Sequence, residues 1–115
     1  GDDCAVLDVP PGTRLVVSTD ASVEDVHFRR DWLTPEEIGW RATTSALSDL
    51  AAMGAWPLGV VTAVAVPPAW RDALPALADG IGAAVRAAGT VIVGGDLTGG
   101  RELAVTVTVL GHAAR

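Results

Sequence analysis

The chain has 115 residues, of which 14 are acidic and 8 basic, so its formal net charge is -6, and 50% of its residues are hydrophobic. The basic residues are all arginines scattered along the chain, and no basic patch suited to a phosphate backbone is present, so we predict no nucleic-acid partner. A single cysteine, Cys4, excludes an internal disulfide and predicts a cytoplasmic location. The longest apolar stretch, residues 58–70, contains prolines and is too short to cross a bilayer, so we predict no membrane partner.

Two apolar runs open the chain. Residues 4–9 and 14–19 are rich in apolar and β-branched side chains, and Pro10-Pro11-Gly12 separates them. Apolar runs bounded by turn residues predict two strands joined by a turn. Asp20 directly follows the second run and is expected at the end of that strand.

A helix-start signature follows. Thr34, Pro35 and Glu37 occupy the N-cap, first and third positions of a capping box, which predicts a helix from residue 35 to about Met53, ended by Gly54. Five residues recur at helical spacing and predict a narrow face that packs on a sheet: Ile38, Ala42, Ala46, Leu50 and Met53.

The second half of the chain repeats the alternation of strand and helix. We predict a strand over 58–66, a helix over 70–88 ended by Gly89, a strand over 90–93 that enters a Gly94-Gly95-Asp96 bend, and a strand over 102–110. The order is then ββαβαββ. This order predicts an α+β or α/β domain with a mixed sheet and helices on one face.

Acidic residues stand where an unpaired charge is costly, at the ends of apolar elements or on an apolar face. They are Asp2 and Asp3, Asp20, Asp49 and Asp96. Several carboxylates together without histidine or cysteine favour Mg²⁺, a hard ion that prefers oxygen ligands. Ser18 and Thr19 add hydroxyl oxygens beside Asp20. An acidic site of this kind binds an anionic nucleotide only when divalent cations lie between them.

Each of these features also has a purely structural explanation. The Gly94-Gly95-Asp96 segment lacks the Gly-Lys-Ser/Thr of a P-loop and is by itself often just a tight turn, although glycines there would let backbone N–H groups approach a phosphate. Asp49 is alternatively a buried, hydrogen-bonded cap. His27 is alternatively a strand histidine at a sheet edge, and the four tryptophans are most simply core or helix-flanking residues.

Taken in order, five motifs resemble the N-terminal domain of thiamine-monophosphate kinase, a family of the aminoimidazole-ribonucleotide-synthetase-like superfamily of ATP-using enzymes. The motifs are Gly1-Asp2-Asp3-Cys4-Ala5-Val6-Leu7, Val17-Ser18-Thr19-Asp20, Val23-Glu24-Asp25-Val26-His27-Phe28, residues 47–55 (LSDLAAMGA) and Val93-Gly94-Gly95-Asp96. The resemblance covers essentially the whole chain. It implies a mixed, largely antiparallel four-stranded sheet with two helices on one face, and transfer of the γ-phosphoryl group of ATP to thiamine monophosphate.

The resemblance also assigns roles to residues of this chain. It implies Mg²⁺ ligands at Asp3, Ser18, Thr19, Asp20, Asp49 and Asp96, ATP contacts at Gly95 and Asp96, and a thiamine-phosphate contact at His27. No catalytic protein group is expected, because the attacking atom is an already ionised phosphate oxygen of the substrate. Residues 1–115 would form a single ATP- and Mg²⁺-binding domain, cut at both ends from a longer cytoplasmic enzyme that pairs as a homodimer through its sheets and has a C-terminal domain.

Three positions depart from the family pattern. Members commonly have Gly near Asp25, Asn near Ala46 and Thr at the position of Leu97. Two other readings remain open: a related ATP-using synthetase that acts on another substrate, and a non-catalytic Mg²⁺- and nucleotide-binding dimerisation module. The signatures GDD and STD argue against the first, and intact Asp3, Asp20, Asp49 and Asp96 argue against the second.

Overall fold

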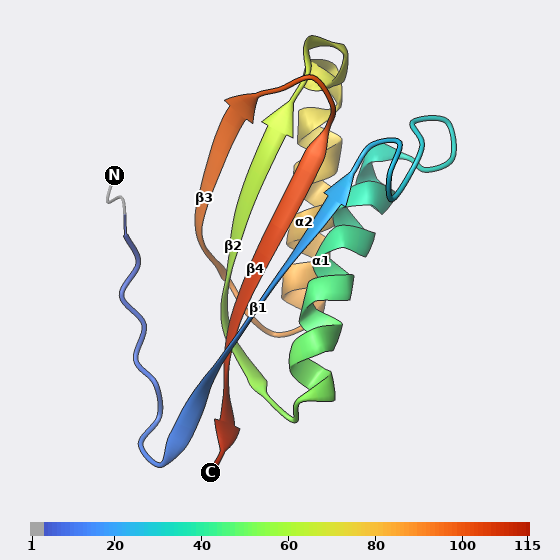
Figure 1. Cartoon of the computed structure of the whole chain (residues 1–115). Helices are drawn as coiled ribbons and strands as arrows, with labels where there is room; N and C mark the ends of the chain where they lie inside the picture. Colours follow the sequence, from blue (N-terminus) through green and yellow to red (C-terminus); the bar gives the residue numbers. More distant parts are fainter. Residues whose placement is uncertain (1–3) are drawn as a thin grey trace.

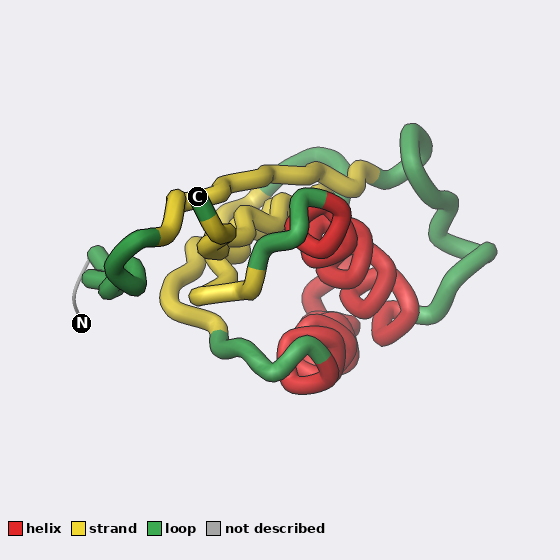
Figure 2. Tube along the Cα trace, turned by 90° about the horizontal axis from the view of Figure 1, so that it is seen from below, coloured by secondary structure: helices red, strands yellow, loops and turns green. Residues whose placement is uncertain are grey.

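The chain folds as a four-stranded sheet with two helices packed on one of its faces (Figures 1 and 2). The computed structural model describes residues 4–115. Its elements are β1 (Thr13–Val23), α1 (Pro35–Ala52), β2 (Trp56–Val66), the 3-10 helix η1 (Pro68–Ala73), α2 (Leu74–Ala87), β3 (Ile92–Gly99) and β4 (Ala104–Ala114). The strand order is β1-β4-β2-β3. β4 pairs antiparallel with β1 and with β2, and β2 pairs parallel with β3, so the predicted mixed, largely antiparallel α+β fold is confirmed.

Helix α1 begins where the sequence predicts it. Thr34 Oγ1 accepts a hydrogen bond from the Glu37 backbone N–H, and the Thr34 backbone N–H donates to Glu37 Oε1, each at 3.2 Å. This reciprocal pair satisfies two donors that the first turn of a helix otherwise leaves unpaired. The hydrogen bond from the Thr34 backbone also lowers the pKa of Glu37 below its usual value.

The core lies between the sheet and the two helices. Alternate residues of the last strand region are fully buried on the side that faces the helices: Leu103, Val105, Val107 and Val109. Ile38, Ala42, Ala46 and Leu50 of α1 are buried against them, as their spacing predicts. Met53 is wrongly assigned to this face: it is the C-cap of α1 and its side chain is 67% exposed. The apolar stripe of the helix therefore ends one turn earlier than predicted.

The N-terminal strand predicted over residues 4–9 is absent from the part of the chain that the structure describes. Val6 is 93% exposed there, and no strand pairs with this segment. An apolar run forms a strand only where a partner strand can accept its backbone hydrogen bonds. The segment instead runs outside the sheet before the chain turns into β1 (Figure 1).

Two predicted strand ends are also wrong. β1 continues past Asp20 to Val23, because β4 pairs with it along its whole length. Gly94, Gly95 and Asp96 form no bend: they lie inside β3, where Gly95 pairs with Thr62 and Asp96 with Ala63. A Cβ atom on Gly95 would lie 3.0 Å from the backbone oxygen of Thr62, so glycine fits the close approach of the two strands.

Thr43 provides a stability prediction. Thr43 lies in α1, and its side-chain oxygen is buried. Among residues 4–115, this oxygen has no hydrogen-bond partner. Replacing the hydroxyl by a methyl group of similar shape removes this desolvation cost. We expect Thr43→Val to raise the free energy of unfolding by about 1 kcal/mol in urea denaturation.

The adjacent threonine supplies the matched control. Thr44 is only partly buried, so water reaches its side chain, and both substitutions place valine in the same helix. Thr44→Val should therefore change stability little. A loss of stability in Thr43→Val would show that the Thr43 hydroxyl is satisfied in solution.

Candidate functional site

Four polar side chains meet between β1 and α1, and we call them the β1–α1 cluster: Ser18, Asp20, Ser45 and Asp49. Ser18 Oγ donates to Asp49 Oδ2 at 3.3 Å, and Ser45 Oγ donates to Asp20 Oδ2 at 2.9 Å. Strand alternation explains the arrangement, because the β4 partners of Ser18 and Asp20 are the buried Val109 and Val107. Both β1 side chains therefore point to the helix side of the sheet. The cluster gathers two carboxylates and two hydroxyls at the edge of the domain.

Asp49 does not share the buried face of α1, contrary to the prediction. Its side chain is exposed, while Ala46 and Leu50 beside it in the sequence are buried. The position lies at the border of the apolar stripe, where α1 passes the edge strand β1, and its carboxylate accepts a hydrogen bond from Ser18. The alternative of a buried cap is excluded by the same exposure. Asp49 is thus available to solvent and to a ligand.

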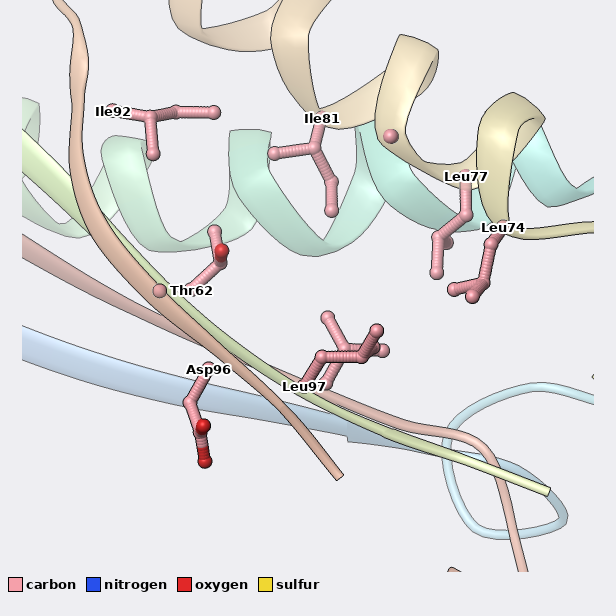
Figure 3. Close-up of a pocket in the computed structure, with 10 residues that line it drawn as sticks. Thr62, Leu74, Leu77, Ile81, Ile92, Asp96 and Leu97 are labelled. Atoms are coloured by element: carbon pink, nitrogen blue, oxygen red, sulfur yellow. The ribbon is translucent and has the colours of Figure 1, made fainter. Parts of the chain in front are cut away.

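Asp96 lies on the opposite face of the sheet and at the opposite edge. Its register partners across the sheet are Ala63 and, through Ala63, Thr106 and Ala21. Figure 3 shows its carboxylate pointing away from Leu77 and Ile81 of α2. β1 and β3 are the two edge strands, so one chain does not bring Asp96 to the β1–α1 cluster. Within residues 4–115, no group of three histidine, cysteine, aspartate or glutamate side chains is close enough to hold a metal ion.

Thr19 is separated from its sequence neighbours by the strand alternation. Its hydroxyl lies 2.9 Å from the Thr108 hydroxyl on the face that the helices leave open. Asp3, the remaining predicted metal ligand, lies outside the described residues. The predicted ligand set is therefore distributed over both faces of the sheet, and whether it binds one group of metal ions stays a prediction.

A hollow of about 440 Å³ lies on the open face beside Asp96. Its lining includes Cys4 and Ala5 of the N-terminal segment together with Gly94, Gly95 and Asp96 of β3. Cys4 and Ala5 are far from the GGD motif in the sequence, yet they border the same hollow.

A second, apolar pocket of about 420 Å³ lies on the helix side of the same strand (Figure 3). It is lined by Thr62, Val64, Leu74, Leu77, Ala78, Ile81, Ile92, Gly95, Asp96 and Leu97. Gly95 and Asp96 border both hollows, so β3 separates an acidic, open side from an apolar one. Sequence reasoning missed this pocket, although the apolar residues at positions 74, 77 and 81 of one predicted helix were a signal for it.

His27 is exposed in the loop after β1, so the alternative of a strand histidine is wrong. The backbone N–H of Val23 donates to His27 Nδ1 at 2.9 Å. Asp25 in the same loop has a φ of 67°, a left-handed conformation that favours glycine but that aspartate adopts more readily than most residues. The departure from the family's Gly at this position therefore keeps the turn.

The open face of the sheet carries exposed apolar side chains. Leu15 and Val17 of β1 are 53% and 55% exposed, and they alternate with the helix-facing Ser18 and Asp20. Figure 2 shows both helices on the other side of the sheet. Among the described residues, no helix is long and apolar enough to cross a membrane.

The model of a known protein family, described as "AIR synthase related protein, N-terminal domain", matches residues 1–113. The chain belongs to this family. This AIR synthase related domain is 42% identical over 112 residues to the thiamine-monophosphate kinase of Synechococcus elongatus, a match that covers 96% of the domain and 34% of the relative. The chain thus spans about a third of the length of the curated relatives it matches.

Solved structures share the fold. The crystal structure of thiamine-monophosphate kinase from Stenotrophomonas maltophilia K279a superposes with a TM-score of 0.90 at 37% identity, over 100% of this AIR synthase related domain and 36% of that chain. Escherichia coli HypE, a hydrogenase maturation protein, superposes with a TM-score of 0.79 at 26% identity, over 96% of this domain and 36% of that chain. The predicted fold family is therefore confirmed, and the same fold occurs in proteins of different function.

Proposed function

We propose that the protein phosphorylates thiamine monophosphate with ATP, and that this chain is the domain that binds the metal and the nucleotide. The observation that carries the proposal is its 42% identity, over nearly the whole chain, to a curated thiamine-monophosphate kinase. The chain spans about a third of such relatives, and the proposal includes a second domain that completes the active site. The 115-residue chain alone is expected to be inactive.

Mg²⁺ would be held at Asp3, Ser18, Thr19, Asp20, Asp49 and Asp96, the positions to which the resemblance assigns ligands. The described ones lie on both faces of the sheet and form no single group within one chain. The chemistry of the described donors fits this ion, because all of them are carboxylate or hydroxyl oxygens. Among residues 4–115, Asp20 and Asp49 each accept one side-chain hydrogen bond and keep further oxygen lone pairs free. When bound, Mg²⁺ would neutralise the negative charge that develops on the transferring phosphoryl group.

The chain's own residues would act by positioning and by balancing charge. Ser45 and Ser18 orient the carboxylates of Asp20 and Asp49, and each hydroxyl leaves the second carboxylate oxygen free. The Gly94-Gly95 segment of β3 has no side chains and would let a phosphate approach the backbone beside Asp96. A strong general base is unnecessary, since a substrate phosphate oxygen is already ionised at neutral pH.

A homodimer through the open face of the sheet belongs to the same proposal. Leu15 and Val17 expose apolar surface there, and a sheet with one bare apolar face is stabilised by a second layer. The same face of a second copy of the chain is equally apolar and could cover these side chains. Sedimentation of the full-length gene product should give twice the mass of one chain.

One other function is favoured by a specific observation. HypE shares the fold at 26% identity, so a related enzyme that uses ATP on another substrate is the alternative. The GDD and STD signatures of this chain favour the kinase over it. A non-catalytic dimerisation module that binds Mg²⁺ and nucleotide is a third interpretation, and only a purely structural module predicts no stabilisation by a nucleotide with Mg²⁺.

The deciding experiment is an assay of the full-length gene product with thiamine monophosphate, ATP and Mg²⁺. We expect thiamine diphosphate and ADP in equal amounts, and no thiamine diphosphate when Mg²⁺ is chelated. A thermal-shift assay with ATP and Mg²⁺ separates the remaining readings. Stabilisation without thiamine diphosphate formation would indicate the related enzyme or the non-catalytic nucleotide-binding module, and no stabilisation would indicate a purely structural module.

A further inference from the structure

The loop that follows β1 holds the His27 imidazole in one orientation. Val23 N–H donates to His27 Nδ1 at 2.9 Å, and the His27 backbone N–H donates to the Val23 carbonyl at 2.8 Å. A ring nitrogen that accepts a hydrogen bond carries no proton, so a neutral His27 must carry its proton on Nε2. The exposed ring therefore presents Nε2–H as a donor to whatever lies outside the loop.

Glu24, at the start of this loop, ties three distant segments together. Its Oε1 accepts hydrogen bonds from the Trp70 indole Nε1–H at 3.0 Å and from the Leu103 backbone N–H at 3.1 Å. The Glu24 backbone N–H donates in turn to the Leu103 carbonyl at 2.9 Å. Trp70 is 4% exposed and Leu103 is fully buried. Breaking these hydrogen bonds would therefore leave buried donors without water as a replacement partner, which costs free energy.

Trp70 also contacts Phe28 and Arg30, at the other end of the loop. Its ring packs edge-to-face against Phe28 with centroids 6.4 Å apart, and the Arg30 guanidinium lies 5.0 Å over it. Arg30 Nη2 also donates to the Ala69 carbonyl at 2.9 Å. His27 thus lies between Glu24 and Phe28, and both of these neighbours are anchored on Trp70.

We propose that Glu24, acting through Trp70, is a positioning residue for His27: it keeps the imidazole in the Nε2–H form that donates to an anionic, phosphate-bearing substrate. The positioning follows from the contacts above, whereas the identity of the substrate rests on the proposed function. Glu24 itself is turned inward toward Trp70 and Leu103 and need not touch the substrate.

The first test measures the tautomer directly. Full-length protein labelled with ¹⁵N at histidine is examined by NMR at alkaline pH, and the His27 signals are assigned with His27→Gln. The wild type should show an unprotonated Nδ1 and a protonated Nε2. Glu24→Ala should give a mixture of both tautomers, and Glu24→Gln, which retains an oxygen acceptor, should keep the wild-type form.

A matched control and a milder variant keep the test decisive. Glu102→Ala removes an exposed carboxylate one residue from Leu103 and should leave the tautomer unchanged. If Glu24→Ala does not fold, Trp70→Phe serves instead, because it removes the Nε1–H donor and keeps an aromatic ring. A folded Glu24→Ala or Trp70→Phe protein with the wild-type tautomer overturns the proposal.

The second test separates this inference from the proposed function. In the assay above, Glu24→Ala should raise the KM for thiamine monophosphate about tenfold, as expected for one misdirected hydrogen bond to a charged group, with a smaller change in kcat. If His27→Ala raises KM and folded Glu24→Ala does not, Glu24 is not a positioning residue. If the tautomer changes but neither variant alters KM, the positioning role stands and the substrate role of His27 fails.

Discussion

Asp20→Asn should reduce the turnover of the full-length enzyme about 100-fold or more, while its thermal unfolding stays close to that of the wild type. Asparagine has the shape of aspartate, and its side-chain oxygen can still accept the hydrogen bond that Ser45 donates. The fold is therefore preserved. What is lost is one negative charge and one metal-binding oxygen at the proposed site, and both serve mainly in the transition state of phosphoryl transfer.

Asp49→Asn should behave in the same way, because Ser18 can still donate to the substituted side chain. The matched control is Asp79→Asn, an exposed aspartate on α2 outside the proposed site, which should retain wild-type turnover. Initial rates at saturating ATP and Mg²⁺, together with circular dichroism, check the set. A folded Asp20→Asn enzyme with full activity in Mg²⁺ would refute the assignment of Asp20 as a ligand.

Gly80→Ala should lower the free energy of unfolding of the chain by about 3 kcal/mol. A Cβ atom on Gly80 would lie 2.0 Å from the Glu36 backbone oxygen and 2.8 Å from its carbonyl carbon. Both are backbone atoms of α1, so no side chain can rotate to make room. α2 would have to move away from α1 and leave voids in the core that the two helices share with the sheet.

Gly82→Ala, two residues further along α2, is the matched control. A Cβ atom there meets only the flexible end of the Arg86 side chain, at 3.1 Å. Because alanine is the better helix former, this variant should be stabilised by about 0.5 to 1 kcal/mol in the same urea denaturation. Equal stability of the Gly80→Ala and Gly82→Ala proteins would show that the helices do not pack closely at Gly80.

The start of α1 and the strand β4, which local signals specify, were predicted well, whereas the helix predicted over 70–88 begins at Leu74, after the 3-10 helix η1. The Thr34–Glu37 capping box sets the start of α1 by contacts within four residues, and the alternation of buried valines after Leu103 identifies β4. Predictions failed where a distant partner decides the conformation. The apolar run at residues 4–9 finds no strand partner, and Gly94-Gly95-Asp96 is drawn into β3 by pairing with β2.

The candidate site was predicted as a set of residue types rather than as a place. Ser18, Asp20 and Asp49, all candidates from the sequence, lie together between β1 and α1, and Ser18 and Asp49 are hydrogen-bonded across 31 residues of sequence. Their role as metal ligands stays a prediction. Thr19 and Asp96 were expected in the same group, yet they lie on the other face of the sheet. Strand alternation separates Thr19 from Ser18 and Asp20, and the strand order separates Asp96 from both.

By itself, the sequence determined the chemical character of this protein: carboxylate and hydroxyl oxygens, no reactive cysteine pair, and motifs in an order that one family shares. Those properties belong to the residues and survive any folding. Only the tertiary structure decided where these side chains lie in the fold. The strand order β1-β4-β2-β3 depends on contacts between segments far apart in the sequence, such as that of Thr19 with Thr108, 89 residues away. The tertiary structure placed Asp20 and Asp96 at opposite edges of one sheet, and it brought the half-buried Glu24 carboxylate to the Trp70 indole and the Leu103 backbone.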